Sequence, residues 1–140
     1  MNTPKHEISE FISGTEALPV EFVDSYEVVE GVACETYNFS GDDSRDLAVI
    51  HVQPNKMTPR QKVVFGDETI EGWVSGAGEL EVDGVSGESR LYNFKNGQPN
   101  EPVSVKIGET MQWRAGDDEL TFFEICEPKY SEGRFEMVGE

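Results

Sequence analysis

The sequence has few of the residues that cross-link chains or bind transition metals. Its 140 residues include two cysteines and two histidines. Two cysteines are too few for a disulfide framework, and no His-Cys cluster has the spacing of a zinc site. Because Cys34 and Cys126 both fall in apparent strands, we expect free, buried thiols. With His6 and His51 as its histidines, the chain offers no arguable Ser-His-Asp or Cys-His catalytic set.

Positive charge is also scarce, since 11 basic residues stand against 28 acidic ones and the formal net charge is −17. A field of this sign repels nucleic-acid phosphates and anionic lipid, so we expect no nucleic acid and no membrane as partners. No stretch approaches the roughly 20 apolar residues of a membrane span. The N-terminal stretch MNTPKHEISEF lacks the apolar run of a signal peptide. We therefore expect an acidic, cytoplasmic protein.

The hydrophobic residues that are present follow a period of two. The chain length suits a single domain. Residues 1–16 are polar and are expected to form an arm or one short helical turn, before a single β-domain over residues 17–140. In the segment 78–84, Leu80 and Val82 alternate with acidic residues, as a half-buried strand requires. No ten-residue segment has a convincing helical period.

Turn sequences divide the chain into short strands. Gly76-Ala77-Gly78 predicts a hairpin between 69–76 and 78–84, and residues 40–46 are expected to be a turn. The other expected strands are 26–39, 47–54, 89–94, 102–108, 109–113, 120–128 and 134–138. Many short, alternating strands predict an all-β sandwich, jelly roll or closed barrel.

Two spacings carry a family resemblance. Glu71 is followed after six residues by Gly78, within TIEGWVSGAGELEVDG. Gly108 is followed after five residues by Arg114-Ala115-Gly116, and two residues later by Glu119. These spacings resemble parts of the two sequence motifs of the cupin superfamily. The resemblance covers about residues 45–135 and implies a double-stranded β-helix, a jelly-roll barrel.

The first motif departs from the family at its histidines. Cupins usually supply three His and one Glu to a metal, with a His-x-His pair before the Glu. At family spacing Phe65 and Asp67, or Val64 and Gly66, would stand at that pair. We favour a longer loop that places Arg60-Gln61-Lys62 there, because family members often have a proline just before the pair, as Pro59 is here. No alignment supplies a histidine.

The second motif departs at its key positions as well. Arg114 replaces the usual Pro, Glu119 replaces the His, and Phe123 falls where Asn is usual. Of the three His and one Glu that usually bind the metal in this family, the resemblance retains Glu71, and Glu119 stands at the position of one histidine. A transition metal prefers imidazole donors, so we expect no metal cofactor. If a metal were held, Glu71 and Glu119 would be its ligands.

The remaining motif positions bear charge or aromatic rings. Arg60, Lys62 and Arg114 are expected either to pair internally with glutamates or to form a subsite for an anion or a polyol. By alternation Trp73 shares a face with Glu71, and Phe123 shares one with Glu119. These rings are either ligand-stacking groups or plain core.

His51 is expected to lie on the same strand face as Leu47 and Val49. A structural histidine is the default interpretation, and a general base is the alternative.

Three functions remain open on the sequence. The first is a metal-independent cupin that binds a small polar metabolite, a sugar or small acid, through Glu71, Trp73, Arg114, Glu119 and Arg60 or Gln61. The second is a sugar isomerase or epimerase with Glu71 or Glu119 as general base. The third is a structural or regulatory module with a filled barrel. Family members often pair N-terminal strands across a dimer, so we also expect a homodimer, with 26–39 as the candidate strand.

Overall fold

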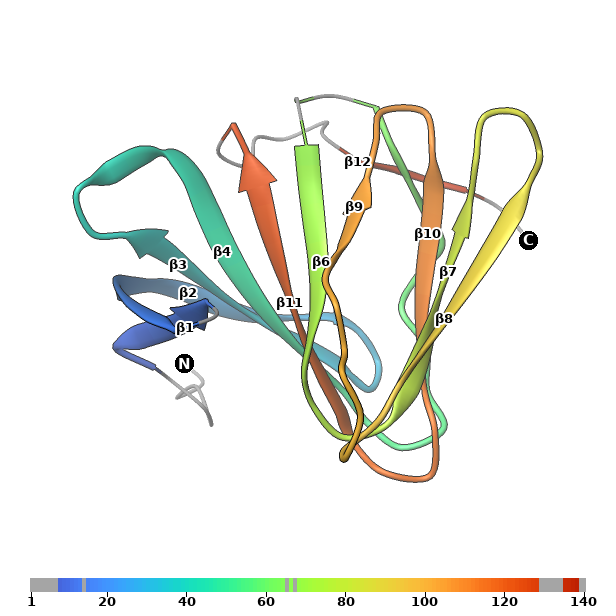
Figure 1. Ribbon diagram of the computed structural model, residues 1–140, viewed down its shortest axis with the longest axis horizontal. Helices are drawn as coiled ribbons and strands as arrows, with labels where there is room; N and C mark the ends of the chain where they lie inside the picture. The colour runs from blue at the N-terminus through green and yellow to red at the C-terminus, as the bar shows by residue number, and fades with distance from the viewer. Residues whose placement is uncertain (1–7, 14, 65, 67, 129–134, 139–140) are drawn as a thin grey trace.

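The fold consists of β-strands arranged in two antiparallel sheets (Figure 1). The structure, a computed structural model, describes residues 8–13, 15–64, 66, 68–128 and 135–138. These residues form twelve strands and no helix. No helix within them is therefore long and apolar enough to span a membrane. The prediction of an all-β jelly roll is confirmed.

The larger sheet has seven strands in the order β1 (Glu10–Ser13), β2 (Glu16–Val29), β3 (Val32–Phe39), β4 (Asp42–Val52), β11 (Leu120–Glu127), β6 (Glu68–Ser75) and β9 (Val103–Val105). The smaller sheet has five, in the order β12 (Phe135–Met137), β5 (Gln61–Val63), β10 (Thr110–Ala115), β7 (Gly78–Asp83) and β8 (Ser89–Phe94). The sheets face each other and draw together at the end where β6 passes into β7 (Figure 1).

The predicted hairpin between 69–76 and 78–84 is wrong in its pairing. β6 pairs with β11 and β9, whereas β7 pairs with β10 and β8. The chain therefore crosses from one sheet to the other at Gly76-Ala77. Gly76 has a φ of 86°, which favours glycine, and its Cα lies against the backbone of Glu119, so no side chain fits there. The glycines mark a corner of the barrel.

Alternating residues from both sheets fill the space between them. On β7, Leu80 and Val82 are fully buried, as the sequence predicts. The opposite wall contributes inward residues such as Leu120 and Phe122 of β11. Because the side-chain period of a strand is two, the neighbours of these residues point away from the interior. This alternation decides which polar side chains point into the interior.

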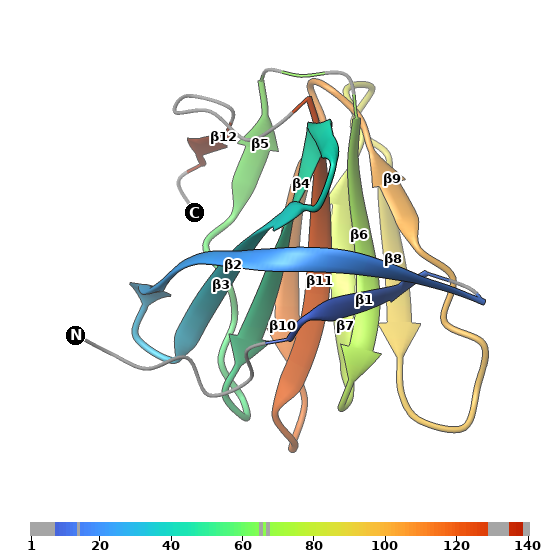
Figure 2. The same ribbon diagram turned by 90° about the vertical axis from the view of Figure 1, so that its left-hand side faces the viewer.

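The N-terminal strands cover the outer face of the larger sheet. β1 pairs with the start of β2, and both cross over β4, β11 and β6 (Figure 2). Residues 10–13 are therefore a strand and not a helical turn, while residues 1–7 lie outside the described part. Phe11 makes edge-to-face contacts with Phe39 and Phe123, with ring centroids 6.3 Å and 4.9 Å apart. A second apolar cluster thus lies outside the barrel interior.

The stretch 26–39 is two strands rather than one. β2 ends at Val29, and β3 begins at Val32 after a turn in which Gly31 has a φ of 86°. Strand β4 already begins at Asp42, so only residues 40 and 41 of the expected turn over 40–46 lie outside a strand. β3 pairs with β2 and β4 and has no open edge. A homodimer stays a prediction.

Gly72 is expected to tolerate no side chain. A Cβ atom there would overlap the ring of Phe123 on the neighbouring strand β11. Gly72→Ala should lower the free energy of unfolding by about 1–3 kcal/mol through overpacking. Gly116→Ala is the control, since its Cβ would lie 3.6 Å from the nearest atom. Equal denaturation midpoints in urea for the two variants would contradict this packing.

Candidate functional site

A cavity of about 410 Å³ lies between the two sheets. This volume falls in the range of small-molecule sites. Its wall combines buried side chains from β10 and β11 with residues of β2, β3, β4, β5, β6 and β12. Exposed apolar side chains of Val23, Tyr26 and Met137 also line it. The cavity therefore runs from the surface near β2 and β12 to the barrel interior.

Glu71 is the most buried polar residue of the cavity wall. Its side chain lies on β6, and its exposed fraction is 0%. The indole Nε1 of Trp113, on the facing sheet, donates a hydrogen bond of 2.7 Å to Oε1 of Glu71. Oε2 has no hydrogen-bond partner among the described residues. One carboxyl oxygen is thus fixed by Trp113, and the other is left for a proton or a ligand.

A second carboxyl group stands beside Glu71. Glu124 of β11 is its direct partner in the β6–β11 pairing, and both residues line the cavity. Burial raises the pKa of Glu71 well above its usual range, and the charge of Glu124 raises it further, while the hydrogen bond from Trp113 opposes the shift. Glu71 is fully buried and Glu124 is half-buried, and two adjacent carboxyl groups in such a place share a proton and titrate together. The arrangement can hold, give up or accept one proton inside the barrel.

Both cysteines are buried thiols outside any disulfide, as predicted, and both line the cavity. Burial raises the pKa of the Cys34 thiol to about 12. The Sγ of Cys126 lies 3.9 Å from Oε1 of Glu124. Because the thiolate is the nucleophilic form, Cys34 is inert at neutral pH.

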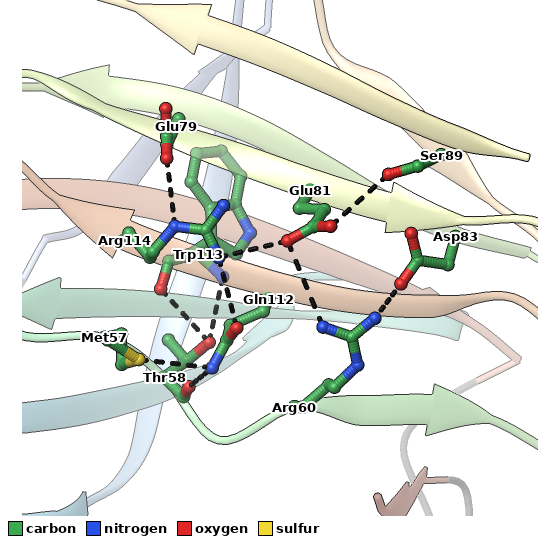
Figure 3. A network of polar contacts seen from close by, with 10 residues as sticks. All are labelled: Met57, Thr58, Arg60, Glu79, Glu81, Asp83, Ser89, Gln112, Trp113 and Arg114. Carbon is green, nitrogen blue, oxygen red and sulfur yellow. Dashed lines mark hydrogen bonds and ion pairs between the residues drawn. The ribbon is translucent and has the colours of Figure 1, made fainter. Parts of the chain in front are cut away.

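The arginines of the motif positions lie on the other face of the smaller sheet (Figure 3). On β10, Trp113 points inward, so Arg114 points outward. Its Nε donates to Glu79 at 2.9 Å, and its Nη1 donates to Glu81 at 3.1 Å. Arg60 pairs with Asp83 and approaches Glu81. The expected pairing of arginine with glutamate is present, but it joins strands on the outside and does not line the cavity.

The neighbouring motif residues divide between the two faces. Gln61 is opposite Met111 in the β5–β10 pairing, and both line the cavity. Lys62 follows Gln61 and precedes the buried Val63, so its side chain leaves the opposite face. Of the three residues expected at the His-x-His position, Gln61 alone lines the described cavity. Positions 65 and 67 of the alternative alignment lie outside the described residues.

Glu119 does not join Glu71. It is exposed, in the turn between β10 and β11, with its backbone against Gly76. The inward residues of β11 begin at Leu120, so the expectation of Glu71 and Glu119 in one interior is corrected. Phe123 packs in the outer cluster. The indole of Trp73 donates to the carbonyl of Gly76 at 2.9 Å, and Trp73 is not among the described lining residues.

His51 lies on the outer face of the larger sheet, on the same side of β4 as Leu47 and Val49, as predicted. Its Nδ1 is 3.0 Å from Oγ1 of Thr121, and its Nε2 is 3.4 Å from Oε1 of Glu35. The hydroxyl of Tyr37 also donates to that Oε1, at 3.0 Å. These contacts give His51 a structural place within the sheet.

Solved structures of two kinds share this architecture. The capsular polysaccharide assembling protein CapF from Staphylococcus aureus matches with a TM-score of 0.68 and 15% identity, over 87% of this chain and 35% of that one. Oxalate decarboxylase from Lactobacillus farciminis matches with a TM-score of 0.67 and 20% identity, over 82% and 33%. The enzyme from Bacillus subtilis matches with a TM-score of 0.65 and 20% identity, over 84% and 30%.

The chain has a cupin fold. It spans about a third of the length of these structures. At these identities the similarity concerns the fold alone. No protein-family profile and no curated protein matches the sequence. The cupin resemblance read from the motif spacings is thus confirmed at the level of the fold, while the ligand is left open.

The interior of this cupin barrel does not fit the transition metal that the family's His and Glu ligands hold. Among the described residues, those around Glu71 offer the Glu124 carboxyl group and no imidazole, since His51 faces the other side of the sheet. The N–H of Trp113 also occupies Oε1 of Glu71. The described residues contain no group of three or more His, Cys, Asp or Glu side chains able to hold a metal ion. Glu119, expected as the second ligand, is on the surface.

Sequence reasoning missed Glu124 and the role of Trp113. The alternation of β11 carries the signal, because Leu120, Phe122, Glu124 and Cys126 share one face. A glutamate on the apolar face of an inward strand is the feature that identifies it. Its contact with Glu71 could not be read from the sequence, since it depends on which strand lies beside β6.

Proposed function

We propose that this cupin-fold protein binds a small polar metabolite in the barrel cavity, without a resident metal. The observation that carries the proposal is the buried carboxyl group of Glu71, which lines a 410 Å³ cavity and whose Oε2 has no hydrogen-bond partner among the described residues. A buried polar atom without a partner costs about 1–3 kcal/mol. A ligand that supplies a donor there recovers that loss.

The chemistry of the wall favours hydroxyl groups over carboxylates. The described lining residues include Asp46, Glu71 and Glu124, and none of them is Lys, Arg or His. A small acid would meet like charges in a low-dielectric interior. Asn38 and Gln61 add amide groups to the same wall. Of the two ligand classes expected from the sequence, a sugar or polyol is the better match.

Enzymatic activity is the second candidate, and the Glu71–Glu124 pair is the observation in its favour. A carboxyl group whose pKa is raised keeps its proton at a higher pH than an ordinary glutamate, and it can give that proton up as a general acid. The reaction class would be proton transfer on a bound sugar, as in an isomerase or epimerase. A filled structural barrel is the weakest of the three alternatives, because the cavity is the size of a ligand site.

A thermal-shift screen of sugars, polyols, sugar phosphates and small acids, with and without divalent metals, tests the proposal. A ligand at about 100 times its dissociation constant stabilises by about 2.7 kcal/mol. For a domain of this size that corresponds to roughly 9 °C in Tm. We expect the shift for a polar neutral ligand without added metal. Glu71→Gln should reduce it, and the surface control Glu119→Gln should not.

Two results would contradict the proposal. One is a screen in which no compound shifts Tm; the other is stoichiometric zinc, iron or nickel in protein purified without added metal. Turnover assays on any ligand found then separate the candidates. Loss of turnover with binding retained in Glu71→Gln would indicate an enzyme.

A further inference from the structure

The cavity has two chemically different ends. At its inner end stand the carboxyl groups of Glu71 on β6 and Glu124 on β11, which are direct partners in the β6–β11 pairing. At its outer end, β2 and β12 contribute only apolar or aromatic residues to the described wall: Val23, Tyr26, Val28, Phe135 and Met137. A ligand that reaches both ends therefore meets acidic groups at one of them and an apolar surface at the other.

The strand register shows how far apart the two ends lie. A row of paired residues crosses β6, β11, β4 and β3 and lines the cavity: Glu71, Glu124, Ala48 and Thr36. β2 is the next strand of the sheet, four strand spacings from β6. At ~4.8 Å per spacing this is about 19 Å measured along the sheet. A compact ligand at Glu71, such as a single sugar ring, would leave the outer end unfilled.

A second row, of more apolar residues, runs beside the first. Phe122, Ile50 and Cys34 are partners across β11, β4 and β3, and Tyr26 continues the row on β2. All of them line the cavity. The carboxyl groups of the described wall come from β6, β11 and β4, and β3 and β2 add none. The apolar strip thus extends to the outer end, whereas the acidic groups do not.

Three side chains at the outer end are largely open to solvent. The exposed fraction is 54% for Val23, 49% for Tyr26 and 61% for Met137. Exposed apolar residues that gather at one site, here around the mouth of a cavity, are characteristic of contact surfaces. An apolar group of a ligand that covers them leaves water together with them, and this favours binding.

Resting on the proposed function of this cavity, we propose that its ligand is a sugar or polyol that carries an apolar substituent, as in an aryl or alkyl glycoside. The hydroxylated part lies at Glu71 and Glu124, where carboxyl oxygens accept hydrogen bonds from hydroxyl groups. The substituent lies against the apolar side chains of β2 and β12. Hydroxyl groups of a second sugar unit placed there would lose water without matching partners, at a cost in free energy.

Isothermal titration with matched glycosides tests the inference. For glucose, galactose and xylose, the panel contains the free sugar, the methyl glycoside, the phenyl glycoside and a disaccharide. We expect phenyl glycosides to bind more tightly than methyl glycosides by roughly tenfold or more, because the phenyl group buries apolar area. Their binding should also have the more negative heat-capacity change. Disaccharides should bind no more tightly than methyl glycosides.

Variants at exposed positions locate the effect without disturbing the core. Val23→Ser and Met137→Ser should lower the affinity for phenyl glycosides toward that for methyl glycosides, and should leave the methyl glycosides unaffected. Leu91→Ser is the matched control, since Leu91 is also 54% exposed but is not among the described lining residues. It should change neither affinity. Glu71→Gln, at the inner end, should weaken the binding of every compound in the panel.

The inference and the proposed function fail in different ways. Phenyl and methyl glycosides of equal affinity, or disaccharides that bind more tightly than phenyl glycosides, would overturn the inference and leave the proposed function standing. A preference for phenyl glycosides that survives in both Val23→Ser and Met137→Ser would overturn it as well. If neither this panel nor the thermal-shift screen yields a ligand, both proposals fall.

Discussion

Replacing Trp113 with alanine is expected to lower the free energy of unfolding by about 3–5 kcal/mol, the range for large aromatic residues in cores. The side chain is 2% exposed and stacks on Phe122. It also packs against Phe94, with ring centroids 5.2 Å apart. The substitution also removes the hydrogen bond that Trp113 donates to Oε1 of Glu71. The fully buried carboxyl group of Glu71 then lacks its indole donor.

Urea unfolding followed by circular dichroism measures this loss of unfolding free energy, and two further variants serve as comparisons. Trp113→Phe keeps a ring in the stack and removes the indole N–H, so it should cost about 1.5–3 kcal/mol, as for a hydrogen bond to a charged group. Leu91→Ala, at a residue that is 54% exposed, should change stability by no more than about 0.5 kcal/mol. Similar midpoints for Trp113→Ala and Leu91→Ala would show that Trp113 is not part of a packed interior.

Glu71→Gln is expected to make the protein more stable than the wild type at neutral and alkaline pH. The amide keeps an oxygen that accepts from Trp113, and its NH₂ group can donate toward Glu124. Folding raises the pKa of Glu71 through burial and through Glu124, so the native state binds more protons than the unfolded state above the ordinary glutamate range. The contribution of Glu71 to stability is therefore fully present below pH 4.5, its unfolded value, and is lost as pH rises toward the folded pKa.

The measured quantity is the difference in unfolding free energy between variant and wild type, from urea titrations at several pH values. Taking the difference cancels the titration of the other acidic residues. The gap should open above about pH 4.5 and grow by at most about 1.4 kcal/mol per pH unit. The exposed Glu119→Gln should give a nearly flat difference. A flat line for Glu71→Gln would mean that Glu71 is solvated, and would contradict the burial of its carboxyl group.

A destabilising buried carboxyl group in an otherwise apolar wall is itself informative. Glutamine would fit the same space with less cost, so packing alone does not explain a glutamate at this position. Perturbed titratable groups that line a cavity are characteristic of functional sites. The stability measurement and the ligand experiments are therefore linked, because Glu71 governs both.

Much of the fold follows from local sequence patterns. Alternation in segments such as GELEVDG predicts both the strand and its buried residues, because the backbone of a strand sends successive side chains to opposite faces. The composition limits the chemistry of the interior, since two histidines cannot supply a His-rich metal site. The motif spacing places Glu71 in the barrel. Each of these features depends on residues close together in the chain.

The sheet assignment and the partners of Glu71 were decided only by the tertiary structure. β6 and β7 follow each other directly in the chain but belong to different sheets, and Glu124 meets Glu71 from a strand 53 positions later, the difference between 124 and 71. The face on which a side chain lies also depends on the strand register, because a shift of one residue exchanges the inner and outer faces. Counting motif spacings across loops put Glu119 and Arg114 inside, whereas Arg114 points outward from β10 and Glu119 is exposed in the turn before β11. Strand neighbours and loop lengths are set by packing across the whole barrel, so the sequence named Glu71 and Gln61 of the candidate site and the fold supplied the rest.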